Sequence, residues 1–441
     1  MRNFSSFSRL SDLSISPEDV LSHAYKTGFC SRIGKIHPCD FWESFCVESM
    51  RGVLSHNDLA ARMDAEGKAS VSRQAIGYKT SEAGLQFFKS ILAMAMRQNV
   101  QVPEEMKRNH AFKRIIVQDS TVLKLPQRLY PDFSGVKNAH ATVSNARVQA
   151  VYDVLAGSFL HYSIDPYSRN DQAAALDFNL QPGDLSLKDR GYLSIASIRK
   201  VQNQKAHTIF RYKNPTVFYD VKTGEKIDLA HALEKEGYLD KTVMMGATKG
   251  EQVKVRVVAF PVPEEVANLR RMKTKKEIKG KNPSKELLFL LGWSIFITTL
   301  PKEDVTAKEI AQLYGIRWRI ENVFKTWKSN FCFDHIHNVS ALQLRMLLTA
   351  RLTMISLLQH SIFNPLALVV KKVGRELSLM KFMRYAQNNF IEMMSHPSQA
   401  IRLENLRTPM LKYAVMDQRK RVSLGEQIQL LMQSISIQPL T

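Results

Sequence analysis

The order of strand-like and helix-like segments between residues 113 and 213 constrains the fold more than any other feature of this chain. The β-branched run at 113–118 (KRIIVQ) predicts a strand, and alternating runs at 147–155 and 158–164 predict a hairpin around Ala156-Gly157. The rest of the region predicts a helix, a strand, a helix and a strand, at 168–180, 185–188, 192–204 and 206–213. This order indicates an α/β fold in which helices cover a sheet.

Two aspartates lie directly after expected strands. Asp119 follows the run at 113–118, and Asp189 follows the apolar run at 185–188. Open α/β sheets place their functional sites at the carboxyl ends of strands, so both aspartates are candidates. Each position is also typical of a turn residue, because Asp forms Asx-turns and helix caps after strands.

A third acidic residue lies in the segment 314–328 (YGIRWRIENVFKTWK), which we predict to be one α-helix capped near Thr306. At 3.6 residues per turn, Tyr314, Arg317, Glu321 and Lys328 share a polar stripe beside an apolar one. A carboxylate held beside two cations and a phenol suits a metal ion next to phosphates. An ordinary solvated helix face shows the same pattern, so this helix alone does not establish a metal site.

Asp119, Asp189 and Glu321 together form the candidate metal-binding and catalytic set. Carboxylates from two strand ends and one packed helix suit a pair of Mg²⁺ ions, which prefer oxygen ligands and a substrate phosphate. Two such ions about 4 Å apart activate the attacking oxygen and stabilise the leaving oxygen of an in-line displacement. A site of this kind cuts and joins phosphodiesters.

The charge balance points to an anionic partner. The chain has 62 Lys and Arg against 41 Asp and Glu, a formal net charge of +21. Because each phosphate neutralised releases counterions, nucleic acid is the first expectation and an anionic membrane surface the second.

Compartment and membrane signals are weak. We expect neither a signal peptide nor an anchor, since the first residues contain no long apolar run, and the apolar stretch 342–370 is interrupted by charges as a buried helix would be. Four cysteines in 441 residues indicate no disulfide framework, which favours a reducing cytoplasm. A zinc site built from Cys30, His37, Cys39 and Cys46 lacks a CxxC pair, so scattered thiols explain these residues better.

The N-terminal part, residues 1–105, is predicted to be helical. Two short helices at 55–64 and 70–79, joined by a turn at Gly67, are similar to a helix-turn-helix. Ser72, Arg73, Gln74 and Lys79 would then face outward, and Arg73 is a candidate DNA contact.

Beyond the second aspartate, strand-like runs predict a mostly β insertion at about 212–286. Its end carries a basic patch, which we interpret as a contact for the DNA backbone. The patch consists of Arg270, Arg271, Lys273, Lys275, Lys276, Lys279, Lys281 and Lys285. A buried strand is expected within 287–300, and the helices predicted after residue 330 suit packing and self-association.

The motif Tyr-x2-Arg-x3-Glu-x6-Lys at Tyr314 to Lys328, with QDST at 118–121 and KDRGY at 188–192, resembles bacterial insertion-sequence transposases. These are DDE enzymes of the insertion-sequence four group with the Y-R-E-K signature. The resemblance runs from the helix-turn-helix-like segment to about residue 360.

This resemblance implies a ribonuclease H-like core at 106–335 with the β insertion inside it. It also implies a DNA-binding domain at 1–105 and a helical region at 336–441 that could dimerise. Asp119, Asp189 and Glu321 match the metal-binding triad, and Tyr314, Arg317 and Lys328 match residues that hold DNA phosphates. An aromatic residue of the insertion region that stacks on a flipped base matches Trp293 best, and Arg190 of KDRGY is a further candidate DNA contact.

The activity implied is cleavage and strand transfer at the ends of an insertion sequence, with Mg²⁺ as cofactor and Mn²⁺ as its substitute. A homodimer on inverted repeats and target DNA, in a bacterial cytoplasm near the nucleoid, follows from the same resemblance. Two alternatives stay open: an inactive DNA-binding regulator of transposition, and a ribonuclease H-fold nuclease that cuts branched DNA without joining it.

Overall fold

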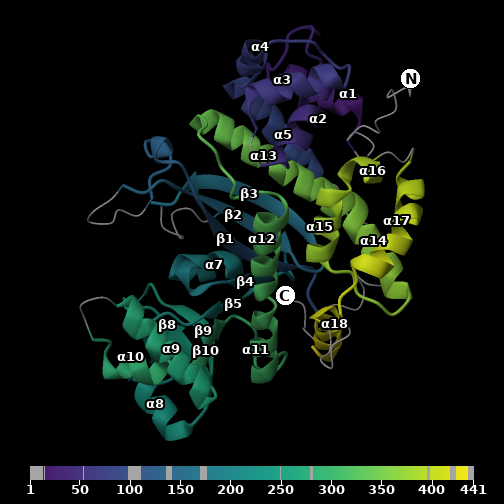
Figure 1. The fold of residues 1–441 in the computed structure, drawn as a ribbon. Helices are drawn as coiled ribbons and strands as arrows, with labels where there is room; N and C mark the ends of the chain where they lie inside the picture. The colour runs from purple at the N-terminus through teal and green to yellow at the C-terminus, as the bar shows by residue number, and fades with distance from the viewer. Residues whose placement is uncertain are drawn as a thin grey trace. The chain divides into compact units, whose positions relative to one another are not determined.

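The structure is a computed structural model, and it describes residues 13, 15–52, 54–97, 111–135, 142–168, 176–248, 250–278, 282–394, 398–417 and 424–435 (Figure 1). The chain forms two compact units and passes between them several times. The first unit contains Met1–Gln101, Ser120–Asn170 and Arg319–Ser423. The second contains Val102–Asp119, Asp171–Trp318 and Leu424–Thr441.

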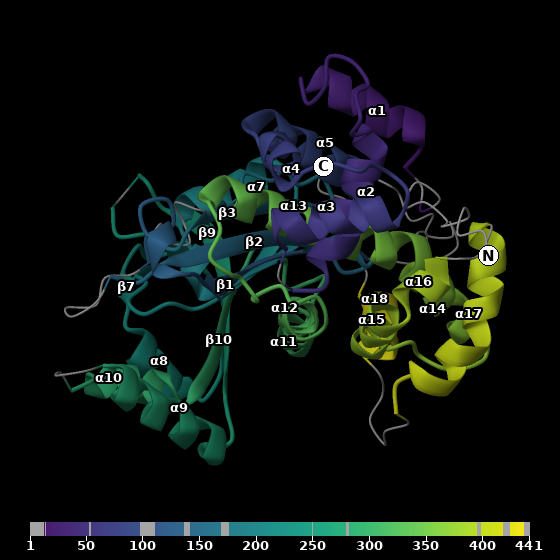
Figure 2. The same ribbon diagram turned by 45° about the horizontal axis from the view of Figure 1, so that its top comes forward.

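The first unit begins with a group of helices (Figure 2), and aromatic side chains form their core. Its helices are α1 (Pro17–Lys26), α2 (Pro38–Ser49), α3 (His56–Ala65), α4 (Arg73–Lys79) and α5 (Glu82–Arg97). Phe41, Phe45, Phe87 and Phe88 are fully buried, and their ring centroids lie 4.9 to 6.2 Å apart in successive contacts. The two short helices predicted as a helix-turn-helix are present as α3 and α4.

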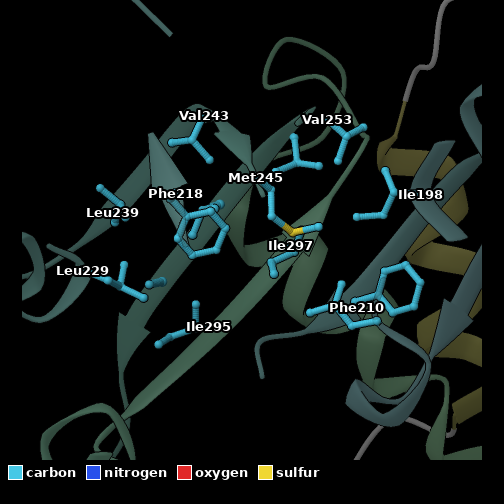
Figure 3. Close-up of a cluster of buried hydrophobic side chains, with 14 of the residues drawn as sticks. Ile198, Phe210, Phe218, Leu229, Leu239, Val243, Met245, Val253, Ile295 and Ile297 are labelled. Atoms are coloured by element: carbon cyan, nitrogen blue, oxygen red, sulfur yellow. The ribbon is translucent and has the colours of Figure 1, made fainter. Parts of the chain in front are cut away.

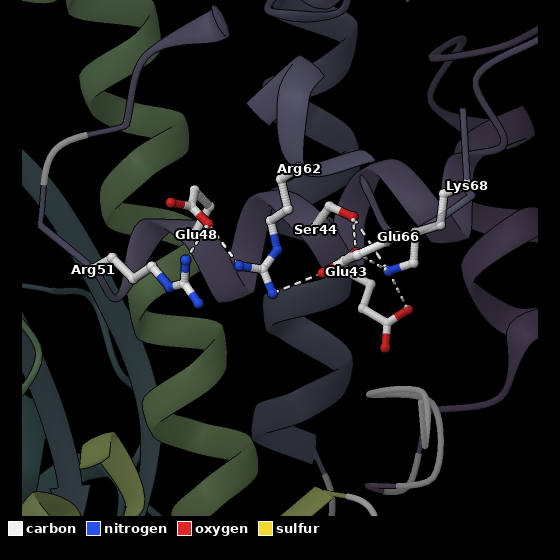
Figure 4. Close-up of polar contacts among 7 residues, drawn as sticks. All are labelled: Glu43, Ser44, Glu48, Arg51, Arg62, Glu66 and Lys68. Carbon is white, nitrogen blue, oxygen red and sulfur yellow. Dashed lines mark hydrogen bonds and ion pairs between the residues drawn. The ribbon is translucent and has the colours of Figure 1, made fainter. Parts of the chain in front are cut away.

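An ion-pair network fixes α3 and the turn after it on α2 (Figure 4). Arg62 of α3 bonds to Glu48 of α2 over 2.8 Å, and also pairs with Glu66 at 2.8 Å. Lys68 lies 3.1 Å from Glu43 and 3.0 Å from Glu66. Because these side chains are only 11 to 17% exposed, the network is less screened than a surface pair and orients α3 firmly. The ring of His37 caps α2 by accepting from the Cys39 amide, so this histidine serves as a helix cap.

The first unit also contains the predicted hairpin. Strands β2 (Asn145–Asp153) and β3 (Ser158–Pro166) pair antiparallel around a turn in which Gly157 has φ +62°. Helix α12 (Trp318–Asn330) packs its apolar side on this hairpin, since the ring of Trp327 lies 4.8 Å from Phe159 and 5.7 Å from Tyr162.

The helices after residue 340 complete this unit. They are α13 (Ala341–Leu358), the π-helical turn η4 (Gln359–Phe363), α14 (Asn364–Lys372), α15 (Leu379–Asn388), α16 (Phe390–Met394) and α17 (Gln399–Tyr413). The stretch Ala341–Lys372 is long and apolar enough to cross a membrane, but 72% of its apolar window is buried inside the structure. That burial is typical of a core helix. Buried Arg351 bonds to the carbonyl oxygens of Ser49 and Gly52 and so joins α13 to the end of α2.

The second unit is built on a sheet whose strands follow the order β1-β4-β5-β10-β9-β8-β6-β7. Strand β1 (Ile115–Lys124) contributes its residues up to Asp119 to this unit, and it pairs in parallel with β4 (Leu185–Lys188). Strand β4 pairs in parallel with β5 (His207–Arg211), and β10 (Trp293–Thr298) is antiparallel to β5. Helix α7 (Ile195–Asn203) connects β4 to β5 and forms the crossover that two parallel strands require.

The segment predicted as a mostly β insertion is a mixture of strands and helices, so the prediction of mostly β structure was wrong. It contains β6 (Phe218–Asp220), β7 (Lys226–Ile227), α8 (Leu229–Glu236), β8 (Leu239–Met245), β9 (Val253–Pro261), α9 (Glu264–Glu277) and α10 (Lys285–Leu290). Phe218, Leu233, Val243 and Ile297 belong to its buried core, which fastens α8 to the sheet (Figure 3). Helix α18 (Leu424–Ser434) also belongs to this unit and bonds to α11 (Ala307–Gly315) through Ser434 and Glu309 over 2.8 Å.

Several predicted boundaries were wrong. Strand β1 continues to Lys124, so Asp119 lies within a strand and not after it. Residues 176–180 are not helical, and 169–175 of that predicted helix lie outside the described residues. The basic segment is the helix α9, and the expected strand at 287–300 begins with α10, because leucine-rich runs suit either state. The predicted helix at 314–328 is two helices, α11 and α12, interrupted at Ile316 and Arg317.

Candidate active site

Asp119 and Asp189 occupy equivalent positions on neighbouring parallel strands. Gln118 of β1 and Lys188 of β4 are Cα partners, and an aspartate follows each of them: Asp119 within β1, and Asp189 directly after the end of β4. Parallel strands advance together and their side chains alternate, so the two carboxylates leave the same face at the same level. Both side chains are partly exposed. The second unit therefore presents a pair of carboxylates where the β1–β4 pairing ends.

Arg317 is bound to the first of these carboxylates. Its Nη1 donates to Oδ2 of Asp119 over 2.7 Å, and the two side chains are 7% and 17% exposed. Arg317 lies in the interruption between α11 and α12, where the backbone is a turn. The predicted polar stripe was therefore wrong for Arg317, which is directed into the protein toward a strand.

Tyr314 is also buried. Its side chain is 5% exposed at the end of α11, and its ring lies 5.2 Å from that of Phe296 on β10. Burial raises the pKa of Tyr314 to about 12, with Arg317 opposing and Asp189 adding to the shift. With its pKa at about 12, the phenol is neutral at pH 7. The Arg317 guanidinium lies 5.7 Å from the Tyr314 ring, so the ring supports the arginine from one side.

Glu321 and Lys328 are on α12, in the first unit. Both side chains are half-buried, and they are two helical turns apart. Nζ of Lys328 donates to the backbone carbonyl of Val122 over 2.9 Å, and this bond holds the end of α12 on the second half of β1. Lys328 therefore already has a hydrogen-bond partner within the protein, the carbonyl oxygen of Val122.

The residues present suit a divalent metal in part. Asp119 and Asp189 offer carboxylate oxygens from one sheet, which is the donor type that hard divalent cations bind. Within the parts of the chain that the structure describes, no three His, Cys, Asp or Glu side chains are grouped closely enough to hold one ion. The pair of aspartates is thus the part of the predicted triad that the geometry of the second unit brings together.

Two tryptophans differ in their surroundings. Trp293, the predicted stacking residue, begins β10, is partly buried against the insertion core, and lies 6.0 Å from the Phe289 ring. Trp318 begins α12, is 55% exposed, and has the Arg317 guanidinium 5.7 Å from its ring. Sequence reasoning missed Trp318. The feature of the sequence that could have identified Trp318 is its position as an aromatic residue between Arg317 and Arg319.

The predicted basic patch divides into two sets. Arg270 donates to the carbonyl oxygens of Leu291 and Trp293, and Arg271 donates to that of Leu288 and pairs with Glu264 at 2.7 Å. These two arginines hold α9 on its neighbours. Lys273, Lys275 and Lys276 are exposed on the same helix, Lys285 begins α10, and Lys279 and Lys281 lie outside the described residues.

The other two predicted DNA contacts, Arg190 and Arg73, are exposed, whereas Lys79, which was expected to face outward, is not. Arg190 begins the short 3-10 turn η3 (Arg190–Tyr192) after Asp189, and Arg73 begins α4. Lys79 is directed inward, since its Nζ donates to the carbonyl of Phe29 over 3.2 Å and lies over that residue's ring. Tyr78, which the sequence did not single out, is 84% exposed on α4.

Comparison with known proteins gives consistent matches. A family model described as "Transposase DDE domain" matches residues 110–357. The transposase for insertion sequence element IS231B of Bacillus thuringiensis subsp. berliner is 26% identical over 407 residues, which is 85% of this chain and 83% of that one. The transposase for insertion sequence element IS1151 of Clostridium perfringens is 25% identical over 350 residues, 74% and 73% of the two chains.

Among solved structures, the chain is similar to the piggyBac transposase in a synaptic complex with hairpin DNA. The identity is 11%, and the match covers 95% of this chain and 86% of that one. The TM-score of 0.39 is too low to support a conclusion about this protein.

Proposed function

Because this chain belongs to the transposase DDE domain family, we propose that Asp119, Asp189 and Glu321 are its three metal-binding carboxylates. The protein is a DNA transposase, an enzyme of DNA cleavage and strand transfer that requires a divalent cation. The observation that carries the assignment is the register of β1 and β4, which puts two of the three carboxylates side by side.

The same reasoning supports a finer classification. The Y-R-E-K spacing of Tyr314, Arg317, Glu321 and Lys328 favours the insertion-sequence four group. The order of β1, β4 and β5 as neighbouring parallel strands favours a ribonuclease H-like core, with the segment from β6 to α10 as its insertion. We place its DNA-binding domain at residues 1–105, its core at 106–335 and a self-associating region at 336–441.

Each residue of the motif then has a physical role. Asp119, Asp189 and Glu321 supply oxygen ligands, preferably to Mg²⁺, with Mn²⁺ as a substitute. When bound, the two ions activate the attacking oxygen and stabilise the leaving oxygen of phosphodiester displacement. Arg317 fixes the orientation of Asp119 through their hydrogen bond.

Tyr314 supports that arginine from one side as a neutral phenol. Lys328 and Arg317 also provide positive charge for the DNA phosphates nearest the cut.

DNA contacts extend beyond the motif. The exposed cations Arg73, Arg190, Lys273, Lys275 and Lys276 bind the DNA backbone, whereas Arg270 and Arg271 act mainly by holding α9 in place. An aromatic side chain that stacks on a displaced base has to be accessible. Trp318, with 55% of its surface exposed, fits that requirement better than the partly buried Trp293.

We further propose that the protein acts as a homodimer on the inverted ends of an insertion sequence and on target DNA. The transposases it resembles are named for insertion sequence elements. Its place would be the bacterial cytoplasm, on the nucleoid.

The decisive experiment measures cleavage and joining of labelled duplexes that carry the DNA flanking this gene. Asp119→Asn, Asp189→Asn and Glu321→Gln should each abolish Mg²⁺- and Mn²⁺-dependent cleavage while leaving duplex binding intact. Glu236→Gln, at an exposed position on α8, is the matched control and should keep full activity. Cleavage that survives Glu321→Gln would remove Glu321 from the triad.

The wild-type chain separates the alternatives in the same assay. Binding of the ends without cleavage in any divalent metal would identify a regulator. Cutting of branched DNA without joining would identify a nuclease.

A further inference from the structure

A pocket lies between the α3–α4 hairpin and residues 337–343, entirely within the first unit. Its volume is about 460 Å³. The side chains that line it include His56, Arg73, Gln74, His337, Asn338 and Gln343. All of these carry N–H donors, and among the described lining residues there is no Asp or Glu. A pocket lined by donors and one guanidinium suits an anion.

Gly77 shapes one wall of this pocket. It lies inside α4, where glycine costs the helix about 1 kcal/mol relative to alanine. A Cβ atom at this position would lie 3.4 Å from Nδ1 of His56 and would extend into the space between them. The helix thus contains a residue that weakens it but keeps the pocket open beside a ring nitrogen.

His337 also belongs to the lining of the pocket. Its Nδ1 is buried and has no hydrogen-bond partner among the residues that the structure describes. Burial lowers the pKa of His337 and of His56, and a hydrogen bond to the backbone of Leu54 opposes this shift at His337. A buried ring nitrogen without a partner is costly, and an anionic oxygen in the pocket satisfies it when that nitrogen carries the ring's proton.

The walls of the pocket are held in place before any ligand binds. Nε2 of Gln343 donates to the carbonyl of Leu54 over 3.4 Å and ties the start of α13 to the segment before α3. His56 Nε2 lies 3.1 Å from Oγ1 of Thr80 at the end of α4. The ion pairs of Arg62 then fix α3 on α2 (Figure 4). A site fixed in this way loses little entropy on binding.

We propose that this pocket binds one backbone phosphate of duplex DNA together with its neighbouring sugar, through Arg73, His56 and His337. The inference rests on the proposed function, because it takes DNA as the partner. Phosphate contacts set the register of a protein on the duplex without reading sequence. A phosphate bound here would position the exposed face of α4, including Tyr78, against the DNA.

The test measures binding of the full-length chain to a labelled duplex of arbitrary sequence over a range of salt concentrations. Arg73→Gln should weaken binding roughly tenfold, because it removes a charged hydrogen-bond donor. It should also make the slope of log K against log salt shallower by about 0.9, the value for one phosphate contact. Arg51→Gln removes the same charge from the same unit, at a side chain that is 56% exposed and outside the pocket, and should change neither quantity.

Gly77→Ala gives an independent readout. It should weaken duplex binding while the free energy of unfolding stays the same or rises, since alanine is the better helix former. Binding of Arg73→Gln and Gly77→Ala that equals wild type, with DNA cleavage intact, would overturn the pocket and the DNA contact of Arg73, and would leave the transposase activity standing. A changed sequence preference with an unchanged salt slope would make Arg73 a base contact and overturn the phosphate assignment. A wild-type chain that binds no duplex would overturn the proposed function as well.

Discussion

Nη1 of Arg317 donates to Oδ2 of Asp119 over 2.7 Å, although the two residues are 198 positions apart in the sequence. Asp119 lies on β1, and Arg317 lies where α11 ends and α12 has not yet begun. The bond therefore attaches this interruption to the strand that carries a proposed metal ligand. An arginine here neutralises part of the carboxylate charge and limits the rotamers of Asp119, which prepares it for a defined geometry.

Arg317→Gln should reduce both activity and stability. A largely buried carboxylate that loses its cation costs about 3 kcal/mol, so the free energy of unfolding should fall by that order. Strand cleavage should fall by more than the folded fraction explains, because Asp119 loses its orienting partner. Urea unfolding and single-turnover cleavage measure the two effects.

Lys302→Gln is the control for the Arg317 variant. Lys302 is 65% exposed and 3.9 Å from Asp240, so its loss should change the unfolding free energy by no more than about 0.5 kcal/mol. An Arg317 variant as stable and active as wild type would show that the ion pair does not matter for Asp119.

The two tryptophans should respond in opposite ways. Trp318→Ala should leave stability nearly unchanged but reduce binding and base displacement, since a stacking contact is worth about 1–3 kcal/mol. Trp293→Ala should instead lower the free energy of unfolding by about 3 kcal/mol, because its ring packs on the insertion core. Fluorescence of 2-aminopurine next to the cleavage site reports base displacement. A loss of that signal in Trp293→Ala alone, at unchanged stability, would restore the original assignment.

The basic residues of α9 should separate into DNA contacts and structural residues. Replacing Lys273, Lys275 and Lys276 together by Gln should make the salt slope of DNA binding shallower by up to about 2.7, with stability unchanged. Arg270→Gln and Arg271→Gln should each cost about 2 kcal/mol of stability, because both donate to backbone carbonyls. Equal salt slopes for the triple variant and wild type would exclude α9 from the DNA interface.

The sequence predicted those parts of the fold whose signal is local. The hairpin around Gly157 and the strand Leu185–Lys188 carry their own turn and apolar patterns, and both predictions were confirmed. Helix α17 lies in the region after residue 330 that was predicted to be helical, and it forms although Pro409 lies inside it. The extension of β1 to Lys124 was missed because QDST is polar and typical of a turn, and its strand conformation depends on tertiary contacts.

The candidate site shows the same division. The positions of Asp119 and Asp189 after apolar runs were sufficient to expect them near each other. The helix at 314–328 was predicted from periodicity, which continues through Ile316 and Arg317 and gives no sign of an interruption there. Only the structure shows that this interruption directs Arg317 to Asp119, that Tyr314 is buried, and that Lys328 bonds to Val122.

Lys188 leads to a prediction about pH. It ends β4, between β1 and β5, and burial lowers its pKa from 10.5 to about 8. In the unfolded chain the pKa returns to the ordinary value, so between pH 8 and 10.5 the unfolded state binds more protons than the folded state. Stability should therefore rise with pH across this window, by about 3 kcal/mol in total, and should lose that amount as pH falls to 8.

Lys188→Met should abolish this pH dependence. The variant cannot carry the charge, so it should be more stable than wild type at pH 7 by up to about 3 kcal/mol, and the difference should disappear near pH 10.5. Urea unfolding at several pH values between 7 and 10.5 measures it. Lys254→Met, at an exposed position on strand β9, is the matched control and should follow the wild-type curve. A difference between Lys188→Met and wild type that stays constant over the whole range would mean that the charge of Lys188 costs the folded state nothing.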